Sequence, residues 1–289
     1  MAVIEEKTFI ASAVETIKTI FYALLIAGVF RTLFFQPFWI PSGSMKDTLL
    51  IGDFLFVNKM AYGYSYASCP KVQIPRFGVN IDADDFCGFL KNRDTRILGG
   101  DPKRGDVVVF RHPVTGSDYI KRLIGLPGDK IQMQGGVLQI NGASVKIEAV
   151  ADFVEAYGPQ GSQRNRPICT NGAVGMGADC IKKKYIETLP NDVSHGILDT
   201  IDQDAMQLGG RMNVDSTKVY SVPAGHFFFM GDNRDNSSDS RVPQSLGGVG
   251  FVPIKDIVGR ADRILFSSAG SSIFAFWTWR SNRYLKAVK

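Results

Sequence analysis

The chain has 289 residues, of which 45% are apolar and 21% are charged, a composition that is typical of folded proteins and excludes intrinsic disorder. Its 33 Lys and Arg against 28 Asp and Glu leave a net charge of +5, too mild and too evenly spread to predict nucleic-acid binding. The histidines and cysteines lack the C-x-x-C and H-E-x-x-H spacings, so we expect no metal site and no cofactor.

The most apolar segment, Ile17–Arg31, lies near the N-terminus. Its uncharged part, residues 19–30, would rise only about 18 Å as a helix, against about 30 Å for the hydrocarbon core of a bilayer. Spanning therefore requires Lys18 and Arg31 to extend to opposite interfaces. We predict an uncleaved transmembrane anchor rather than a buried core helix or a signal peptide, because no small-x-small cleavage site follows. The charges on its two sides do not define its orientation. The segment ends in a predicted interfacial belt of aromatic residues: Phe30, Phe34, Phe35, Phe38 and Trp39.

After Pro37 the pattern changes to short apolar runs bounded by Gly, Pro and Asn. Runs of this kind predict β-strands, and helical periodicity is weak, so we expect a mainly β fold. The predicted strands are Asp53–Val57, Asp106–Phe110, Tyr119–Ile124, Lys130–Met133, Gly136–Gly142, Val219–Val222, His226–Met230 and Ile257–Ala261.

Two stretches, residues 64–101 and 143–217, interrupt the strand-rich parts and contain all four cysteines. Few long apolar runs and many turn residues indicate insertions on a core. The C-terminal segment, residues 273–289, combines aromatic and basic side chains. It is either a last helix packed on the domain or a segment that lies on anionic lipid.

The first segment with candidate chemistry is Ile40–Asp53, directly after the anchor. Gly43 allows a sharp turn that could expose the Ser44 hydroxyl beside the Ser42 hydroxyl and a backbone N–H. The same Pro-Ser-Gly-Ser sequence also occurs as a simple turn.

The second segment is Asp118–Asp129, in which Lys121 falls within an apolar β run. Such a lysine is either a solvent-facing edge residue or a buried amine. Burial lowers the pKa of an amine, so a buried Lys121 could be neutral near pH 7 and act as a general base.

The third segment is Gly231–Arg241, rich in Asp, Asn and Ser. A calcium loop is not predicted, because Arg234 stands at its third ligand position. The segment is either a self-capped loop or a shell of carboxylate–arginine pairs that supports a nearby site. No histidine triad motif and no G-x-S-x-G sequence is present, which leaves a serine–lysine pair as the remaining familiar nucleophilic chemistry.

In combination these segments resemble the bacterial type I signal peptidases over about residues 36–265. The match rests on motifs in the family order: Ser42-Gly-Ser-Met45, Arg104–Phe110, Tyr119-Ile-Lys-Arg122 with Gly125–Asp129, Gly231–Arg241, and Gly250–Pro253 with Ile257–Arg260.

The resemblance implies a nucleophile at Ser44 and a general base at Lys121. It implies that the Ser42 hydroxyl and the Ser44 N–H form the oxyanion hole and that Ser237 orients the lysine amine. Structural support is assigned to Asp232, Asp239 and Arg241. The pockets for small substrate side chains are assigned to Ile40, Met45, Leu49 and Ile120.

The resemblance further implies a membrane-bound serine endopeptidase that cleaves signal peptides from exported preproteins, without a metal. We expect antiparallel sheets with a large β insertion, and a catalytic domain on the outer, periplasmic face of the cytoplasmic membrane. The expected division is a cytoplasmic N-terminus and single-pass anchor at 1–40, a catalytic core at 41–130 and 218–289, and an inserted non-catalytic β cap at 131–217. The expected partners are signal peptides and the lipid bilayer, and no nucleic acid. One departure is visible: many members have Pro where this chain has Asp47, within Lys46-Asp47.

Two other functions fit the same sequence. One is a related serine–lysine protease with a narrow client, such as a conjugation-system or self-cleaving repressor-like member, although the anchor and the large insertion argue against the repressor. The other is a membrane-tethered β binding module that uses the aromatic C-terminus as a lipid surface.

The four cysteines allow three disulfide connectivities. We favour Cys69–Cys87 and Cys169–Cys180, because each pair brackets one insertion and closes a short loop.

Overall fold

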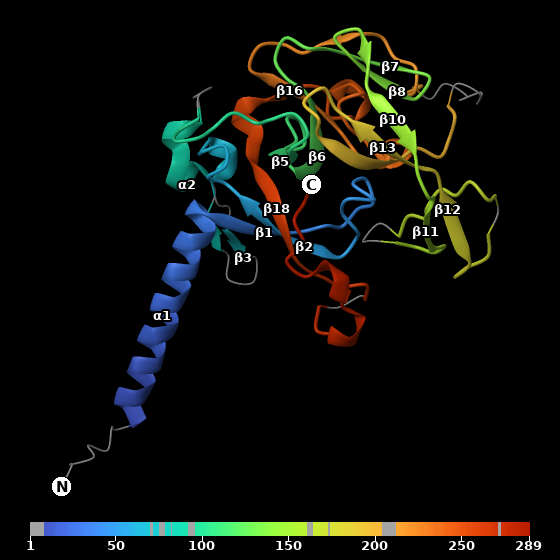
Figure 1. The fold of residues 1–289 in the computed structure, drawn as a ribbon. Coiled ribbons are helices and arrows are strands. Elements are labelled where there is room, and N and C mark those ends of the chain that lie inside the picture. The colour runs from blue at the N-terminus through green and yellow to red at the C-terminus, as the bar shows by residue number, and fades with distance from the viewer. Residues whose placement is uncertain are drawn as a thin grey trace.

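The computed structural model describes residues 9–69, 72–74, 79–81, 83–91, 96–160, 164–172, 174–203, 212–270 and 273–289. The N-terminal helix α1 (Phe9–Leu33) has 25 residues, about 37 Å at 1.5 Å per residue. It points away from the β domain (Figure 1), and its apolar window, Ala11–Arg31, has a mean hydropathy of 1.7 and is 0% buried. The helix extends beyond residues 19–30 at both ends, which supplies the length that a bilayer requires. The predicted apolar helix is confirmed, and it fits a transmembrane helix.

A seven-stranded antiparallel sheet forms the centre of the molecule, in the order β1-β2-β18-β5-β6-β16-β17. Alternating burial along β2 leaves one face of that strand on the core. Along β6, every residue from Ile120 to Gly125 is buried, so this strand is covered on both faces. The strands are β1 (Phe35–Trp39), β2 (Asp53–Asn58), β5 (Val107–Arg111), β6 (Asp118–Gly125), β16 (His226–Met230), β17 (Val252–Pro253) and β18 (Ile257–Ser267).

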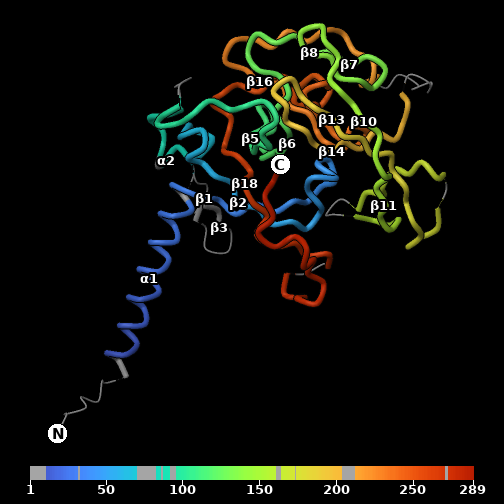
Figure 2. Tube along the Cα trace, viewed as in Figure 1, coloured from blue at the N-terminus to red at the C-terminus, as the bar shows by residue number. Residues whose placement is uncertain are grey.

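Smaller sheets surround this centre (Figure 2). One has the order β15-β7-β8-β9, another the order β10-β13-β14, and two are hairpins. Their strands are β3 (Val72–Ile74), β4 (Val79–Ile81), β7 (Lys130–Gln134), β8 (Val137–Ile140), β9 (Ala143–Ser144), β10 (Lys146–Ala149), β11 (Phe153–Ala156), β12 (Asp179–Lys182), β13 (Lys184–Thr188), β14 (Ser194–Leu198) and β15 (Tyr220–Ser221). The remaining helices are α2 (Ala83–Cys87) and the 3-10 turns η1 (Tyr66–Ser68), η3 (Gly88–Leu90), η4 (Arg234–Asn236), η5 (Gln244–Leu246), η6 (Ile254–Asp256), η7 (Phe276–Thr278) and η8 (Ser281–Arg283). The mainly antiparallel β fold is confirmed.

The segment Phe35–Trp39, which the sequence assigns to the aromatic belt and the range 1–40, is instead strand β1 of the central sheet. Phe38 packs against the core cluster of the sheet rather than serving only as an interfacial residue. Pro37 is tolerated because β1 is the edge strand, where a missing N–H costs no ladder hydrogen bond.

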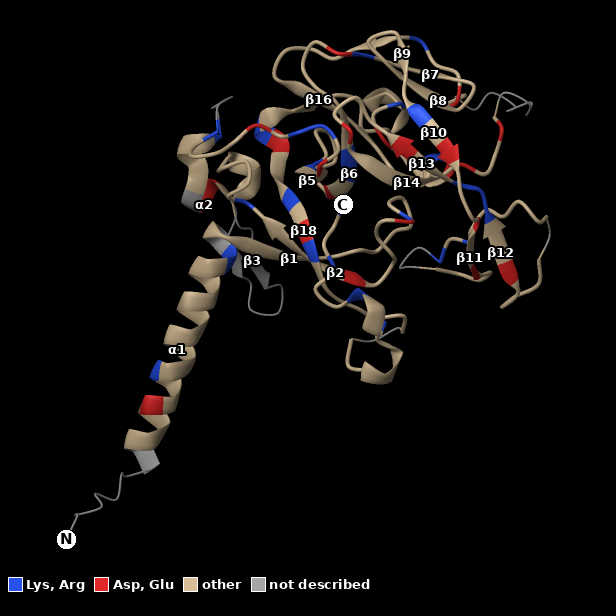
Figure 3. Cartoon of the chain, viewed as in Figure 1, with Lys and Arg blue, Asp and Glu red and all other residues tan. Residues whose placement is uncertain are grey.

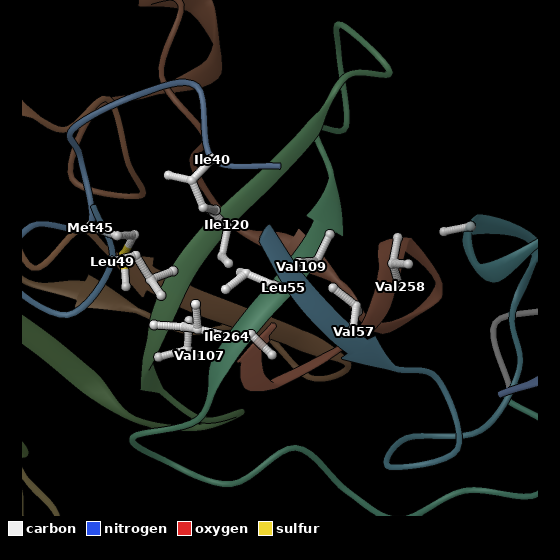
Figure 4. Packing of buried hydrophobic residues seen from close by; sticks show 12 residues of the cluster. Ile40, Met45, Leu49, Leu55, Val57, Val107, Val109, Ile120, Val258 and Ile264 are labelled. Atoms are coloured by element: carbon white, nitrogen blue, oxygen red, sulfur yellow. The ribbon is translucent and has the colours of Figure 1, made fainter. Parts of the chain in front are cut away.

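Buried side chains of β2, β5, β6 and β18 form one hydrophobic cluster with residues of the turn after β1 (Figure 4). In Figure 4, Ile40 lies beside Ile120, and Met45 lies beside Leu49. On another part of β5, Phe110 stacks on Phe229 of β16 with ring centroids 4.5 Å apart. The strand that carries Lys121 is therefore fixed by packing against both of its neighbours.

The C-terminal segment is not the last helix that one interpretation of the sequence predicts. It contains only the short turns η7 and η8. Arg283 is buried and pairs with Asp53, whereas the Trp277 side chain is 85% exposed. The segment is held to β2 by this ion pair and to β18 by the stacking of Trp279 on Phe266, with ring centroids 4.5 Å apart.

Both favoured disulfides are formed, Cys69–Cys87 and Cys169–Cys180. Their Cα atoms are 6.4 Å and 5.1 Å apart, within the range that a disulfide can bridge. All four cysteines are paired.

Protein isolated without reductant is expected to contain these two crosslinks, because disulfides persist on the oxidising side of a membrane. Peptide mapping by mass spectrometry before and after reduction would identify the 69–87 and 169–180 linked peptides. Four thiols that react with an alkylating agent before reduction would contradict the pairing and the expected location of the domain.

Candidate active site

Ser44 lies in the turn that follows β1. The turn begins where the Ile40 N–H donates to the Asp53 carbonyl at 2.9 Å. On its other side, the Asn233 backbone N–H donates to the Ser44 carbonyl at 3.0 Å, and the Asn233 side-chain amide donates to the Gly43 carbonyl at 2.9 Å. Two segments that are far apart in the sequence therefore fix the backbone on both sides of the serine hydroxyl.

Lys121 lies in β6 opposite this turn, and it is only 4% exposed. Its Nζ is 2.6 Å from Ser44 Oγ and 3.1 Å from the Ile120 carbonyl oxygen. Of the two sequence interpretations, the buried amine is therefore confirmed and the edge residue is wrong.

Burial lowers the pKa of Lys121 to about 8, because the ammonium loses its hydration. The carboxylates of Asp239 and Asp232 oppose this shift, and Arg241 adds to it. The amine is therefore partly neutral near pH 8, and in that form its lone pair can accept a proton from the adjacent hydroxyl.

Two fully buried ion pairs support the turn and β6. Arg122 binds Asp232 through two hydrogen bonds, of 2.8 Å and 2.7 Å. Arg241 also forms a bidentate pair with Asp239, with hydrogen bonds of 2.9 Å and 3.0 Å. Burial alone would raise the pKa of each aspartate, but the adjacent guanidinium outweighs burial and holds it below the usual range. Carboxylate–arginine pairs are therefore present in the third segment, and their role as support for a catalytic site stays a prediction.

Gly231, the first residue of the third segment, packs directly against the nucleophile turn. A Cβ at this position would lie 2.3 Å from Ser237 Oγ and 2.6 Å from the Ser44 carbonyl oxygen. Only glycine allows the backbone to approach so closely here. Its N–H donates to Asp239 at 3.0 Å, which links the turn to the buried ion pair.

Ser237 lines the same groove as Ser44 and Lys121. Within the described part of the chain, its buried Oγ makes no hydrogen bond of standard geometry. The Ser237 hydroxyl helps to keep the pKa of Asp239 low, but less than Arg241 and the Gly231 N–H do. Orientation of the lysine amine by Ser237 stays a prediction.

An open groove of about 850 Å³ contains the pair. Its walls include Phe38 and Trp39 on one side and Ser117–Lys121 on another. Ser42 is exposed and also lines it. Among the described residues, none accepts a hydrogen bond from the Ser44 backbone N–H. Both predicted oxyanion donors are therefore at the groove.

The four predicted pocket residues are not equally placed. Ile40, Met45 and Leu49 are 0–1% exposed and belong to the core cluster beneath the turn. Ile120 alone of the four lines the groove, and it is 6% exposed. Three of the four predicted pocket residues therefore lie beneath the groove, and only Ile120 lines it.

Sequence reasoning missed Asn233, Lys46 and Glu155. Asn233 falls inside the Gly231–Arg241 segment, but nothing in that polar run indicates which side chain reaches back to Gly43. Lys46 and Glu155 form a buried ion pair across the turn and the insertion, and neither residue has a sequence pattern that signals the contact.

One group of carboxylates among the described residues could approach a cation: Asp199, Asp215 and Asp235, whose oxygens lie within 4.8 Å of one another. Burial and the two neighbouring carboxylates raise the pKa of Asp199 to about 7. Asp235 accepts the Thr200 N–H at 2.6 Å. A proton on Asp199 relieves the repulsion without requiring a metal ion.

Comparisons with known proteins identify the class as a serine peptidase. The family described as signal peptidase, peptidase S26, matches residues 13–266. Signal peptidase I of Rickettsia typhi (strain ATCC VR-144 / Wilmington) is 36% identical over 255 residues, which is 86% of this chain and 78% of that protein. Signal peptidase I of Rickettsia canadensis (strain McKiel) is 35% identical over 255 residues, 87% of this chain and 79% of that protein. The chain belongs to the signal peptidase family, and it is a type I signal peptidase.

A crystal structure of a signal peptidase I from Enterococcus faecalis V583 is also similar, at 22% identity over 56% of this chain and 97% of that chain. Its TM-score is 0.27, so this likeness carries no argument about the fold.

The pKa of Lys121 leads to a prediction about pH. Because the amine must be neutral to accept a proton, kcat/KM is expected to rise about tenfold per pH unit and to level off above an apparent pKa of about 8. Peptide hydrolysis measured across pH would test this. A flat profile, or a rise only near the value of about 10.4 for a free lysine, would contradict a desolvated base.

Proposed function

We propose that this chain is a membrane-bound endopeptidase that removes N-terminal signal peptides from exported preproteins, with Ser44 as nucleophile and Lys121 as general base. The observation that carries the proposal is the 2.6 Å separation of Lys121 Nζ and Ser44 Oγ in an open groove. Family membership supplies the substrate class.

In the first step, the neutral Lys121 amine accepts the Ser44 proton while Oγ attacks the scissile carbonyl carbon. The negative charge that develops on the carbonyl oxygen is stabilised by the Ser44 N–H and the Ser42 hydroxyl. The Lys121 ammonium then returns the proton to the leaving amine, and an acyl-enzyme remains. Lys121 next takes a proton from a water molecule that attacks the acyl carbonyl carbon. The bond to Ser44 Oγ breaks, the lysine returns the proton to Oγ, and the signal peptide leaves with a free carboxyl group.

The backbone of the groove supports binding of the substrate as an extended strand. β1 is an edge strand. Among the described residues, only β5 pairs with Tyr119–Lys121, because the pairing with β16 begins at Arg122. Unpaired strand edges of this kind accept an added strand from a peptide ligand. Ile40, Met45 and Leu49 already fill the core below the groove, so we expect only small substrate side chains beside the cleaved bond.

The same proposal includes the location of the domains. Helix α1 would cross the cytoplasmic membrane once, with residues 41–130 and 218–289 as the catalytic core and residues 131–217 as a cap on its outer face. The apolar, exposed surface of α1 supports the anchor (Figure 3). The two disulfides support an oxidising compartment for the rest of the chain.

Ser44→Ala and Lys121→Met are each expected to lower kcat for a purified preprotein by about 10⁴-fold or more, and the double variant to be no worse, because the two groups act as one unit. Lys121→Arg should also be inactive, since a guanidinium stays protonated. The matched controls are Ser221→Ala and Lys130→Met, both at exposed positions. Cleavage by Lys121→Met within a few-fold of the wild type would refute the pair. Lipid binding without cleavage by the wild type would instead favour a membrane-tethered binding module.

Ser42→Ala is expected to lower kcat by about a hundred- to thousand-fold with little change in KM, because the lost donor acts on charge that appears only in the transition state. Ser42→Thr should keep much of the activity if the added methyl fits. Rates of both variants on one preprotein would decide between this role and a turn-forming role. An Ala variant within a few-fold of the wild type would remove Ser42 from the oxyanion hole.

A further inference from the structure

The β11–β12 hairpin of the insertion lies against the nucleophile turn, although more than a hundred residues separate them in the chain. Figure 1 shows the hairpin at the side of the molecule, outside the central sheet. Its register pairs Phe153 with Lys182 and Glu155 with Cys180. The Cys169–Cys180 disulfide ties the segment between the strands to β12.

A buried trio of charges joins the hairpin to the turn. Lys46, two residues after Ser44, is 4% exposed, and its Nζ donates to Glu155 Oε2 and, at 2.6 Å, to Gln160 Oε1. Lys182 Nζ lies 2.9 Å from the other oxygen of Glu155. The side chains of Lys182 and Glu155 are 3% and 13% exposed. The trio holds two ammonium groups and one carboxylate, so removal of Glu155 would leave two largely buried positive charges without a counter-charge.

The same lysine also packs on the backbone beside the nucleophile. A Cβ on Gly43 would lie 3.3 Å from Lys46 Cε, so the lysine stem covers this glycine. The next residue, Asp47, pairs with Lys184 of β13 at 2.5 Å. Lys46 and Asp47 therefore both bind the insertion.

The hairpin borders two adjoining grooves. The catalytic groove includes Gln160 and Lys182 in its walls. A second groove of about 1080 Å³ is lined by Phe153–Ala156 and by Ile273 of the C-terminal segment. The two grooves share four residues, Trp39, Lys46, Ile51 and Gln160. The contact between Lys46 and the hairpin thus lies at the junction of both.

We propose that the β11–β12 hairpin is a substrate-binding wall, and that Lys46 and Glu155 are positioning residues that hold it at the nucleophile turn. Its occupant is the extended polypeptide on one side of the cleaved bond. This rests on the proposed function, because the substrate is the peptide cleaved at Ser44. The observations that favour a peptide are the continuity of the second groove with the catalytic groove and walls that mix apolar and polar side chains, as an extended peptide requires.

The test compares substrates of different length. Lys46→Met and Glu155→Gln are expected to raise KM about tenfold for a peptide that extends about ten residues on each side of the cleavage site, with kcat within about threefold. Shortening the peptide from one end should abolish this difference once the peptide no longer reaches the wall. The double variant should lose less than the sum of the two single losses, because the residues contact each other.

The matched control is the exposed pair Lys183–Asp152, next to the same hairpin but without a contact to the nucleophile turn. Lys183→Met and Asp152→Asn are expected to match the wild type on every peptide. Gln160→Ala removes a neutral side chain that bonds both Lys46 and Glu155. It should give a smaller rise in KM, and it serves as the test if the charge variants do not fold.

Several results would contradict the proposal that the hairpin is a substrate-binding wall. They are an equal loss for all peptide lengths, a fall in kcat with unchanged KM, or charge variants equal to the wild type. These results differ from those expected if the proposed function itself is wrong. In that case the wild type would cleave no peptide, or Ser44→Ala would remain active.

Discussion

The burial of the Lys121 amine is the physical constraint on which the proposed site depends. A lysine in water holds its proton up to a pH of about 10.4 and cannot accept one from a serine. Here β6 is buried on both faces, so the ammonium loses its hydration and the pKa falls to about 8. The packing of the sheet therefore lowers the pKa of the amine that we propose as the general base.

The charged groups around the buried Lys121 amine also affect its pKa. Two carboxylates, Asp232 and Asp239, lie close enough to stabilise the ammonium and to raise its pKa again. Each is matched by a guanidinium, Arg122 or Arg241, in a bidentate pair. The pairs fix β6 and the Gly231–Arg241 loop, and Arg241 offsets part of the rise in the lysine pKa that the two carboxylates cause.

The nucleophile turn is held at three places, and two of its partners, Asn233 and the β11–β12 hairpin, are far from it in the sequence. Asn233 binds its carbonyls, Asp53 closes its base, and Lys46 joins it to the inserted hairpin. A serine placed by such contacts needs no regular helix or strand of its own. The insertion is thus physically part of the site surroundings, even though its own strands lie outside the central sheet.

The sequence by itself determined the local features: the apolar helix, the short strands, the cysteine pairs that close short loops, and the serine and lysine in their motifs. Each depends on residues that are neighbours in the chain, so periodicity and turn residues reveal it. The sequence did not show whether Phe35–Trp39 is a β-strand or an interfacial aromatic belt, because mostly apolar residues fit both roles. The pairing of this segment with β2 identifies it as a strand. Nor did the sequence reveal which amide holds Gly43 or that Lys46 meets Glu155. Those contacts exist only after distant segments pack together, because burial and the choice of a hydrogen-bond partner are properties of the folded chain and not of its local sequence.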